Sequence, residues 1–441
     1  MNIRNMCNFV FDWNEFNKKV GVVSFFIHPI DLYRIKLGMS ISLFRVCLVI
    51  FIFSSLLYGI AYHTKIEKKI VLFLFGILLS IAISSLHIVD FKYAISFYIN
   101  DIMGGLIVLS VLVTYRSRND VILLSKSLIY SVIFPFLFSA YVYYMFFVLN
   151  ELVDTLPFTE YVSAVINDDS DPVARIGFFP RLCFPYFTPP FLAIMISIYT
   201  VLVFYSKKEI VNRLNCYIRP VLIFLLIGCL TRTVYLSLLL TVILGTCFHK
   251  FKKTFVVLFT KYLLIISGII MMVYLFLPSE ITELIYSKFI DRLSIDTSEG
   301  PDRHVLLIYE AFYIMFASIE NFLLGIGDQN LSLLKGVNTY LAPSMLNSYL
   351  TLLTYRGLIG TVVILFFYFY PFCVLKRNFS NDRLAFVFFL CHFNVMCAFF
   401  TYELRPAFGV WLYMAIIYLY IHTLLKNQQN RICLLYTSDA A

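Results

Sequence analysis

The chain has 441 residues, of which 61% are hydrophobic and only 14% are charged, with a net charge of +9. A soluble domain averages about half apolar and about a quarter charged residues, so this composition excludes a water-soluble fold and predicts an all-α integral membrane protein. The positive charge does not indicate nucleic acid as a partner, because the basic residues lie in short clusters between apolar segments.

Apolar segments with the length of membrane helices follow one another along the chain. We expect about 11 spans (roughly 10 to 12), since each crossing needs about 20 residues. They lie near residues 39–62, 70–88, 93–115, 121–149, 183–205, 217–230, 233–248, 254–277, 352–375, 384–400 and 407–425. The short segments 217–230 and 233–248 meet at Arg232, which predicts a hairpin whose tip lies in the membrane or at its surface. Residues 1–277 and 352–432 would together form the bundle.

Clusters of lysine and arginine in the short loops predict the orientation. They lie near 116–118, 207–213, 250–253 and 376–383, and we expect them on the cytoplasmic side. A smaller acidic loop near 150–182 and a large loop over 278–351 then face the periplasm. One inconsistency is left, because eleven spans with a cytoplasmic C-terminus put the N-terminus outside although residues 1–38 are basic.

The large loop has a helical pattern of its own. Apolar residues at helical spacing predict an amphipathic helix over 280–293, either on the membrane or packed on the bundle. Asp302 can cap a second helix from Arg303 to about Phe322, which Gly325 and Gly327 would end. We do not interpret this second helix as a span, because that would invert every downstream loop.

The C-terminal tail and the cysteines complete the sequence-level picture. The last nine residues, 433–441, resemble a translated sequencing adapter, so we leave them out of the argument as a non-native tail. The ten cysteines have no zinc-site spacing and most lie in apolar runs, so we predict neither a metal nor a cofactor.

Arginines on the predicted external side stand out from acidic surroundings. Arg232 has no carboxylate near it in sequence, and an arginine at the tip of two membrane segments is costly unless an anion pairs with it. A guanidinium matches phosphate oxygens, which points to a phosphate-bearing ligand; the alternative is a snorkelling arginine bound to lipid headgroups. The other external arginines are Arg175, Arg181, Arg303, Arg356 and Arg405.

The motifs around these arginines carry a resemblance. Arg232 stands in Leu230-Thr231-Arg232-Thr233, and Arg303 is followed by Leu324-Gly325-Ile326-Gly327 and, after Asn347, by Gly357-Leu358-Ile359-Gly360. This combination resembles the bacterial O-antigen polymerase and ligase family of membrane glycosyltransferases. The resemblance implies a bacterial inner-membrane enzyme whose substrates are undecaprenyl-pyrophosphate-linked oligosaccharides, with a chain-length regulator protein as a possible partner.

The resemblance also implies roles for individual residues. Arg232 and Arg303 match family arginines that bind the pyrophosphate, and Arg175 matches a third one more loosely. A general base must take the proton from the attacking sugar hydroxyl; the candidates are Asp302, Glu310, Asp328, Glu403 and Asp171, and the sequence does not choose among them. The predicted catalytic set is Arg303, Arg232, Glu403 and Asp302, and the predicted substrate-binding set is Arg175, His304, Asn347 and Arg405.

A polymerase of surface polysaccharide is the function we expect. Family ligases commonly have a histidine directly before the asparagine that corresponds to Asn347. This chain has Leu346 there, which disfavours the ligase alternative. A non-enzymatic flippase for lipid-linked oligosaccharides is the alternative from another class. The long helical loop and the lack of two repeated halves disfavour it.

Overall fold

A computed structural model gives the fold of the chain. It describes residues 12–32, 34–37, 39–64, 66–86, 91–149, 182, 189–206, 210, 215–229, 231–247, 261, 264, 268, 303–327, 347–400 and 408–438. The segment 254–277, expected as a span, and the loops 150–182 and 278–302 therefore lie almost wholly outside the described residues.

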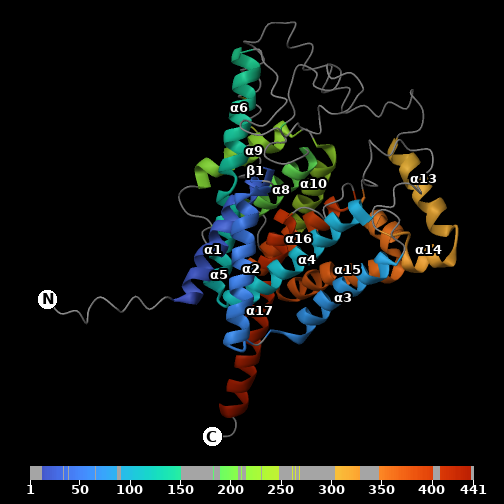
Figure 1. Cartoon of the computed structure of the whole chain (residues 1–441). Coiled ribbons are helices and arrows are strands. Elements are labelled where there is room, and N and C mark those ends of the chain that lie inside the picture. Colours follow the sequence, from blue (N-terminus) through green and yellow to red (C-terminus); the bar gives the residue numbers. More distant parts are fainter. Residues whose placement is uncertain are drawn as a thin grey trace.

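The described part is helical apart from one short hairpin (Figure 1). Its first half contains α1 (Trp13–Ile27), η2 (His28–Leu32), β1 (Arg34–Leu37), β2 (Met39–Ser42), α2 (Leu43–Ala61), α3 (Lys68–Ser85), α4 (Phe91–Thr114), α5 (Arg118–Tyr130) and α6 (Ile133–Leu149). Its second half contains α8 (Pro189–Tyr205), α9 (Asn215–Gly228), α10 (Arg232–Cys247), α13 (Arg303–Phe316), α14 (Ile319–Leu324), α15 (Ser348–Asn378), α16 (Arg383–Ala398) and α17 (Phe408–Ser438).

Helix α17 forms the centre of the bundle. Every residue from Val410 to Ile421 is buried, and a helix that is apolar all round is expected in such a position. Its neighbours include α4 and α5, and Tyr418 stacks on Phe367 of α15 at 4.8 Å between ring centroids. The helix continues to Ser438 and so includes most of the segment 433–441.

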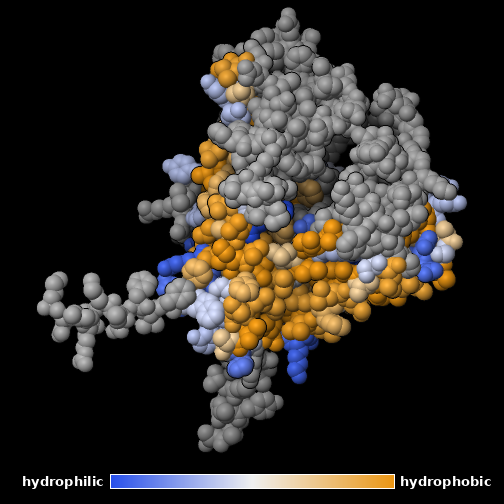
Figure 2. Space-filling view, in the orientation of Figure 1, coloured by the Kyte–Doolittle hydropathy of each residue, from blue (hydrophilic) through white to orange (hydrophobic). Residues whose placement is uncertain are grey.

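Helices α2 and α3 expose apolar side chains along their outer faces. Examples are Phe53 and Ile60 on α2 and Leu72 and Phe75 on α3, each at least 60% exposed. Figure 2 shows this apolar surface as a broad area across the lower half of the molecule. A surface of this kind is unfavourable in water, and together with the long apolar helices it indicates a membrane protein in a lipid bilayer.

The expected count of about eleven spans is not confirmed. Five helical segments of the described part are long and apolar enough to cross a membrane: Leu43–Ala61, Lys68–Ser85, Arg118–Met145 (α5 with most of α6), Ser348–Asn378 and Phe408–Lys426. Other expected spans correspond to shorter apolar helices such as α9, whose 14 residues cover only about 21 Å at roughly 1.5 Å per residue. Hydropathy detects apolar composition, but it does not fix where a helix ends.

The N-terminal region differs from the expectation. The span expected near 39–62 begins only at Leu43, because Met39–Ser42 pairs with Arg34–Leu37 as an antiparallel hairpin. Ser42 then caps α2, since its hydroxyl accepts a hydrogen bond from the Arg45 backbone N–H at 3.1 Å. Helix α1, for which no span was expected, packs on α2 and α5.

The helix expected from Arg303 to about Phe322 is divided into two. Helix α13 ends at Phe316, and Ser318 starts α14 by accepting a hydrogen bond from the Asn321 N–H at 3.0 Å. The side-chain amide of Asn321 also donates to the carbonyl of Ile314 at the end of α13. The predicted stop is confirmed, because Gly325 and Gly327 both have positive φ after α14.

Candidate functional site

A buried ion pair joins three helices of the bundle. The Arg356 side chain on α15 is fully buried, and its Nη2 donates to Oδ2 of Asp101 on α4 at 2.6 Å. Its Nη1 lies 3.5 Å from the hydroxyl of Ser80 on α3. The guanidinium also lies over the ring of Tyr98, with Cζ 5.7 Å from the ring centroid. An ionisable pair inside a membrane bundle is costly to bury, which makes it a candidate functional site.

Polar contacts continue from this pair along α3. The hydroxyls of Ser84 and Tyr98 lie 3.2 Å apart, and Ser84 Oγ donates to the Tyr355 carbonyl at 3.4 Å. Gly360 stands one turn after Arg356, where a Cβ atom would lie 2.8 Å from Ser80 Oγ. The second glycine of the Gly357–Gly360 motif therefore lets α3 and α15 approach closely, as small residues do in membrane bundles.

The first glycine of this motif holds α14 against α15. Gly357 and Gly325 have φ values of +62° and +80° with ψ near 180°, a region that is essentially restricted to glycine. A Cβ atom on either one would lie 2.4 Å from backbone atoms of the other segment. The N–H groups of Ile326 and Gly327 donate to the carbonyls of Thr354 and Tyr355, each at 3.0 Å. We call this double backbone contact the glycine staple.

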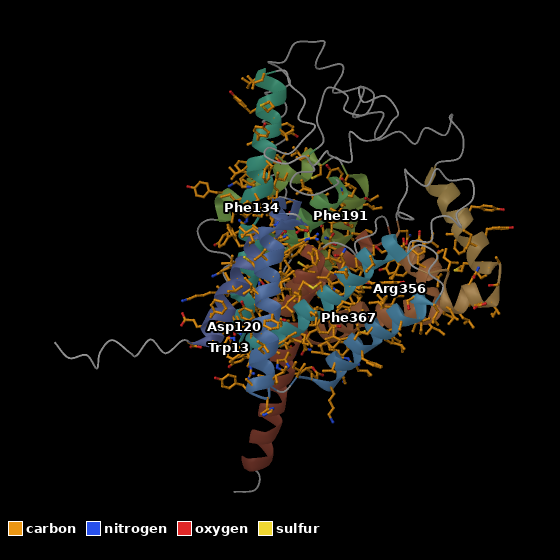
Figure 3. All side chains as sticks on the ribbon, viewed as in Figure 1. Trp13, Asp120, Phe134, Phe191, Arg356 and Phe367 are labelled. Atoms are coloured by element: carbon orange, nitrogen blue, oxygen red, sulfur yellow. The ribbon has the colours of Figure 1, made fainter. Side chains whose placement is uncertain are left out.

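Figure 3 places Arg356 near the end of the bundle where α13 and α14 stand, well separated from Asp120. The ion pair, the kink at Gly357 and the glycine staple follow one another within a few residues of α15. The structure therefore links a buried charge directly to α13 and α14, which lie within the segment 278–351 expected as the large loop.

Asn347 is the one residue of the predicted set whose side chain the structure describes. Its Oδ1 accepts from the Leu350 N–H at 3.0 Å and so caps α15, while its Nδ2 donates to the Phe400 carbonyl at 2.9 Å. The backbone N–H of Ser348 donates to the Phe399 carbonyl at 2.8 Å. Asn347 thus fixes the start of α15 to the end of α16, a structural task that accounts for both ends of its amide.

The other predicted residues are placed only by their backbone or not at all. Arg232 opens α10, while Arg303 and His304 open α13, and their side chains lie outside the described set. The remaining predicted residues also lie outside the described part of the chain: Asp302, Glu403, Arg175 and Arg405.

The two helices that meet near Arg232 pack mainly on different neighbours in the bundle. Helix α9 packs on α8, whereas α10 packs on α16. The turn between them is closed by the Tyr235 hydroxyl, which donates to the carbonyls of Leu226 and Ile227 at 2.9 and 3.0 Å. The Thr231 carbonyl accepts from the N–H groups of Val234 and Tyr235, so α10 begins at Arg232, one residue before the segment 233–248 expected from the sequence.

Sequence reasoning missed Asp101 and placed Arg356 among the external arginines. The signal was available, because each is a charged residue inside an expected span and the two have opposite signs. Their pairing was not available from the sequence, since 255 positions separate them. Burial also changes the interpretation of Arg356, whose described partner is a carboxylate of the chain itself.

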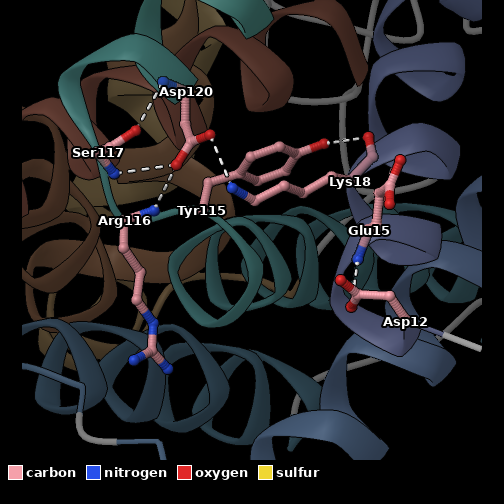
Figure 4. A network of polar contacts seen from close by, with 7 residues as sticks. All are labelled: Asp12, Glu15, Lys18, Tyr115, Arg116, Ser117 and Asp120. Carbon is pink, nitrogen blue, oxygen red and sulfur yellow. Dashed lines mark hydrogen bonds and ion pairs between the residues drawn. The ribbon is translucent and has the colours of Figure 1, made fainter. Parts of the chain in front are cut away.

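A second charged cluster has a structural explanation (Figure 4). Lys18 Nζ of α1 donates to Asp120 Oδ1 at 3.0 Å, and Asp120 Oδ2 accepts from the N–H groups of Arg116 and Ser117. The Tyr115 hydroxyl donates to the Lys18 carbonyl at 2.7 Å. Ser117 and Asp120 form a capping box at the start of α5, because the Asp120 N–H also donates to Ser117 Oγ at 3.1 Å. The contacts of Lys18 fasten α1 to this end of α5, so the cluster has a structural role.

Within the described residues there is no group of three His, Cys, Asp or Glu side chains that could hold a metal ion. No protein-family model matches the chain, and no curated protein matches its sequence.

Proposed function

We propose that the chain is a polymerase of O-antigen or a related surface polysaccharide in the bacterial inner membrane. It transfers a growing glycan from one undecaprenyl pyrophosphate to the non-reducing-end hydroxyl of an incoming lipid-linked repeat unit on the periplasmic side. The bond between the anomeric carbon and the pyrophosphate breaks, and the hydroxyl oxygen forms the new glycosidic bond. A chain-length regulator would act on the same complex.

One observation supports this proposal more than any other. Each of the two motif arginines stands in the first turn of a helix, Arg232 in α10 and Arg303 in α13. A helix N-terminus presents free N–H groups and partial positive charge, so a guanidinium in the same place adds to an environment that favours phosphate. Two such cations would stabilise the pyrophosphate as it leaves. The proton of the acceptor hydroxyl passes to a carboxylate, for which Glu403 and Asp302 are the first candidates.

The ligand can be tested through the geometry of the cation. Arg232→Ala and Arg303→Ala should abolish long-chain polymer while the protein still inserts into the membrane, and lysine at either position should restore only part of the chain length. Lysine keeps the charge but lacks the two-pronged contact with phosphate oxygens. Arg377→Ala is a matched control, because Arg377 lies in the last turn of α15 at the opposite end of that helix from the start at Ser348. Full chain length with lysine at both positions would refute a pyrophosphate clamp of fixed geometry.

Deletion of the gene separates the polymerase from its alternatives. Loss of a polymerase leaves lipid A–core capped with a single repeat unit, because the ligation of one unit still proceeds. Loss of a ligase leaves bare core with polymer held on the lipid carrier, and loss of a flippase leaves repeat units on the cytoplasmic side. Either of the last two phenotypes would overturn the proposal.

A further inference from the structure

Among the described side chains of α13, those that contact the bundle form one narrow stripe. Ala311 and Met315 are fully or almost fully buried, and they lie one helical turn apart. Ala311 belongs to a small separate core with Leu350 and Tyr355 of α15 and with Ile326, against which Ile314 also packs. This core and the glycine staple together fix the orientation of α13 and α14 on α15.

The opposite face of α13 is aromatic and exposed. Tyr309, Tyr313 and Phe316 are 71%, 71% and 64% exposed, and at roughly 100° per residue they point away from the buried stripe. Phe312, which is 44% exposed, lies at the edge of this face, about 80° from the middle of the stripe. The rings of Phe312 and Phe316 stack at 6.1 Å. In α14, the apolar side chain of Ile319 is also exposed, at 74%. We call this surface the aromatic face. Glu310 is the one charged residue among 309–316, whereas a helix facing water carries charged residues along its whole outer face.

The aromatic face continues the lipid-facing surface of the bundle. At the end of α14, Leu323 is exposed, and Gly325 touches Gly357 beside the exposed Leu358 and Ile359 of α15. Helix α15 packs along α3, whose outer side is apolar. Figure 2 shows the apolar surface extending from α2 across α3 towards α14. A surface continuous with the bilayer contact of the spans has the bilayer as its occupant.

We propose that α13 and α14 lie in the bilayer interface, with the aromatic face of Tyr309, Phe312, Tyr313, Phe316 and Ile319 in the region between headgroups and acyl chains. The composition fits this depth, because phenylalanine rings enter the acyl region while tyrosine hydroxyls remain at the headgroups. Helices with one face in this position lie in the plane of the membrane surface. The glycine staple prevents the face from turning away, so the contact is built into the fold.

A fluorescence experiment tests this placement without measuring activity, so its outcome is independent of the proposed polymerase function. The chain has two tryptophans, Trp13 and Trp411, which are replaced by phenylalanine. Phe316→Trp in that background is reconstituted into phosphatidylcholine vesicles with or without bromine on the acyl chains. Phe367→Trp is the matched control, because Phe367 is fully buried inside the bundle. Tyr313→Trp is a second reporter if the first variant does not fold.

The expected result is at least a twofold loss of Phe316→Trp emission in brominated vesicles, with protection from aqueous iodide, and a much smaller loss for the control. Iodide quenching without bromolipid quenching would place the face in water and overturn the proposal. Protection from both quenchers would mean that another protein surface covers the face. Bromolipid quenching that added polyprenyl phosphate relieves would assign the face to the isoprenoid chain, and this too would refute the bilayer contact.

Discussion

Removing one member of the buried Arg356–Asp101 pair should destabilise the protein far more than removing both. Arg356→Met leaves the Asp101 carboxylate buried without its cation. Asp101→Leu likewise leaves the Arg356 guanidinium buried without its anion. With charge centres about 4 Å apart and an effective dielectric constant of about 20, the lost attraction is about 4 kcal/mol. Breaking a buried pair from one side costs about 3–5 kcal/mol in general, and an unpaired arginine inside a span costs about 2.5–3.5 kcal/mol.

The double variant Asp101→Leu/Arg356→Met should recover most of this loss, because two apolar side chains of similar size need no desolvated charge. Reversible unfolding in mixed micelles, followed by helical circular dichroism, measures all three variants. Arg118→Met is a matched control: Arg118 pairs with Asp382 at 2.7 Å, but its side chain is 45% exposed, so the cost should be about 1 kcal/mol or less. The reasoning fails if Arg356→Met costs no more than the control, or if the double variant is no more stable than the single ones.

Two further predictions concern the glycine staple and a buried histidine. Gly357→Ala should release α13 and α14 from α15, because φ at Gly357 is positive and the new Cβ meets backbone atoms of the α14 segment at 2.4 Å. Limited proteolysis within 303–327 measures the release. Gly268→Ala is the control and should not change the cleavage, because open space surrounds its Cβ. Burial lowers the pKa of His28 to about 4, against weaker opposing effects of the Phe25 carbonyl and Asp31. The stability that neutral His28 contributes is therefore complete above pH 6.5 and is lost as the pH falls towards 4, by up to roughly 3 kcal/mol. Thermal unfolding across this pH range should show a smaller loss of stability for His28→Gln than for the unchanged protein.

The sequence predicts those features that depend on neighbouring residues. The apolar composition identified the membrane class, and the glycines after Leu324 and the break before Arg232 marked helix ends that the structure contains. Local capping was harder, because Ser318 can cap α14 only if the chain has already left the helix at Ala317. Hydropathy read that stretch as one helix, although Ser318 and Asn321 carry the hydrogen bonds that divide it.

Features that depend on distant partners could not be predicted. Arg356 looked external because it stands near the outer end of an expected span, and only the packing of α4 and α3 on α15 gives it Asp101 and Ser80. The same holds for the structural partner of Asn347, a residue that was predicted to contact the substrate. Its amide donates to the carbonyl of Phe400, 53 positions away.

The order of contacts along α15 decides how a buried charge can matter for the proposed reaction. Arg356 is adjacent to Gly357, Gly357 touches Gly325, and Gly325 ends the pair of helices that Arg303 opens. A change at the ion pair can therefore reach Arg303 through backbone contacts alone, without any contact between Arg356 and a substrate. The double variant separates the two possibilities, because it restores stability while it removes both charges. Long-chain polymer from that variant would make the pair a purely structural fastening, whereas a stable protein without polymer would show that the charges themselves are needed.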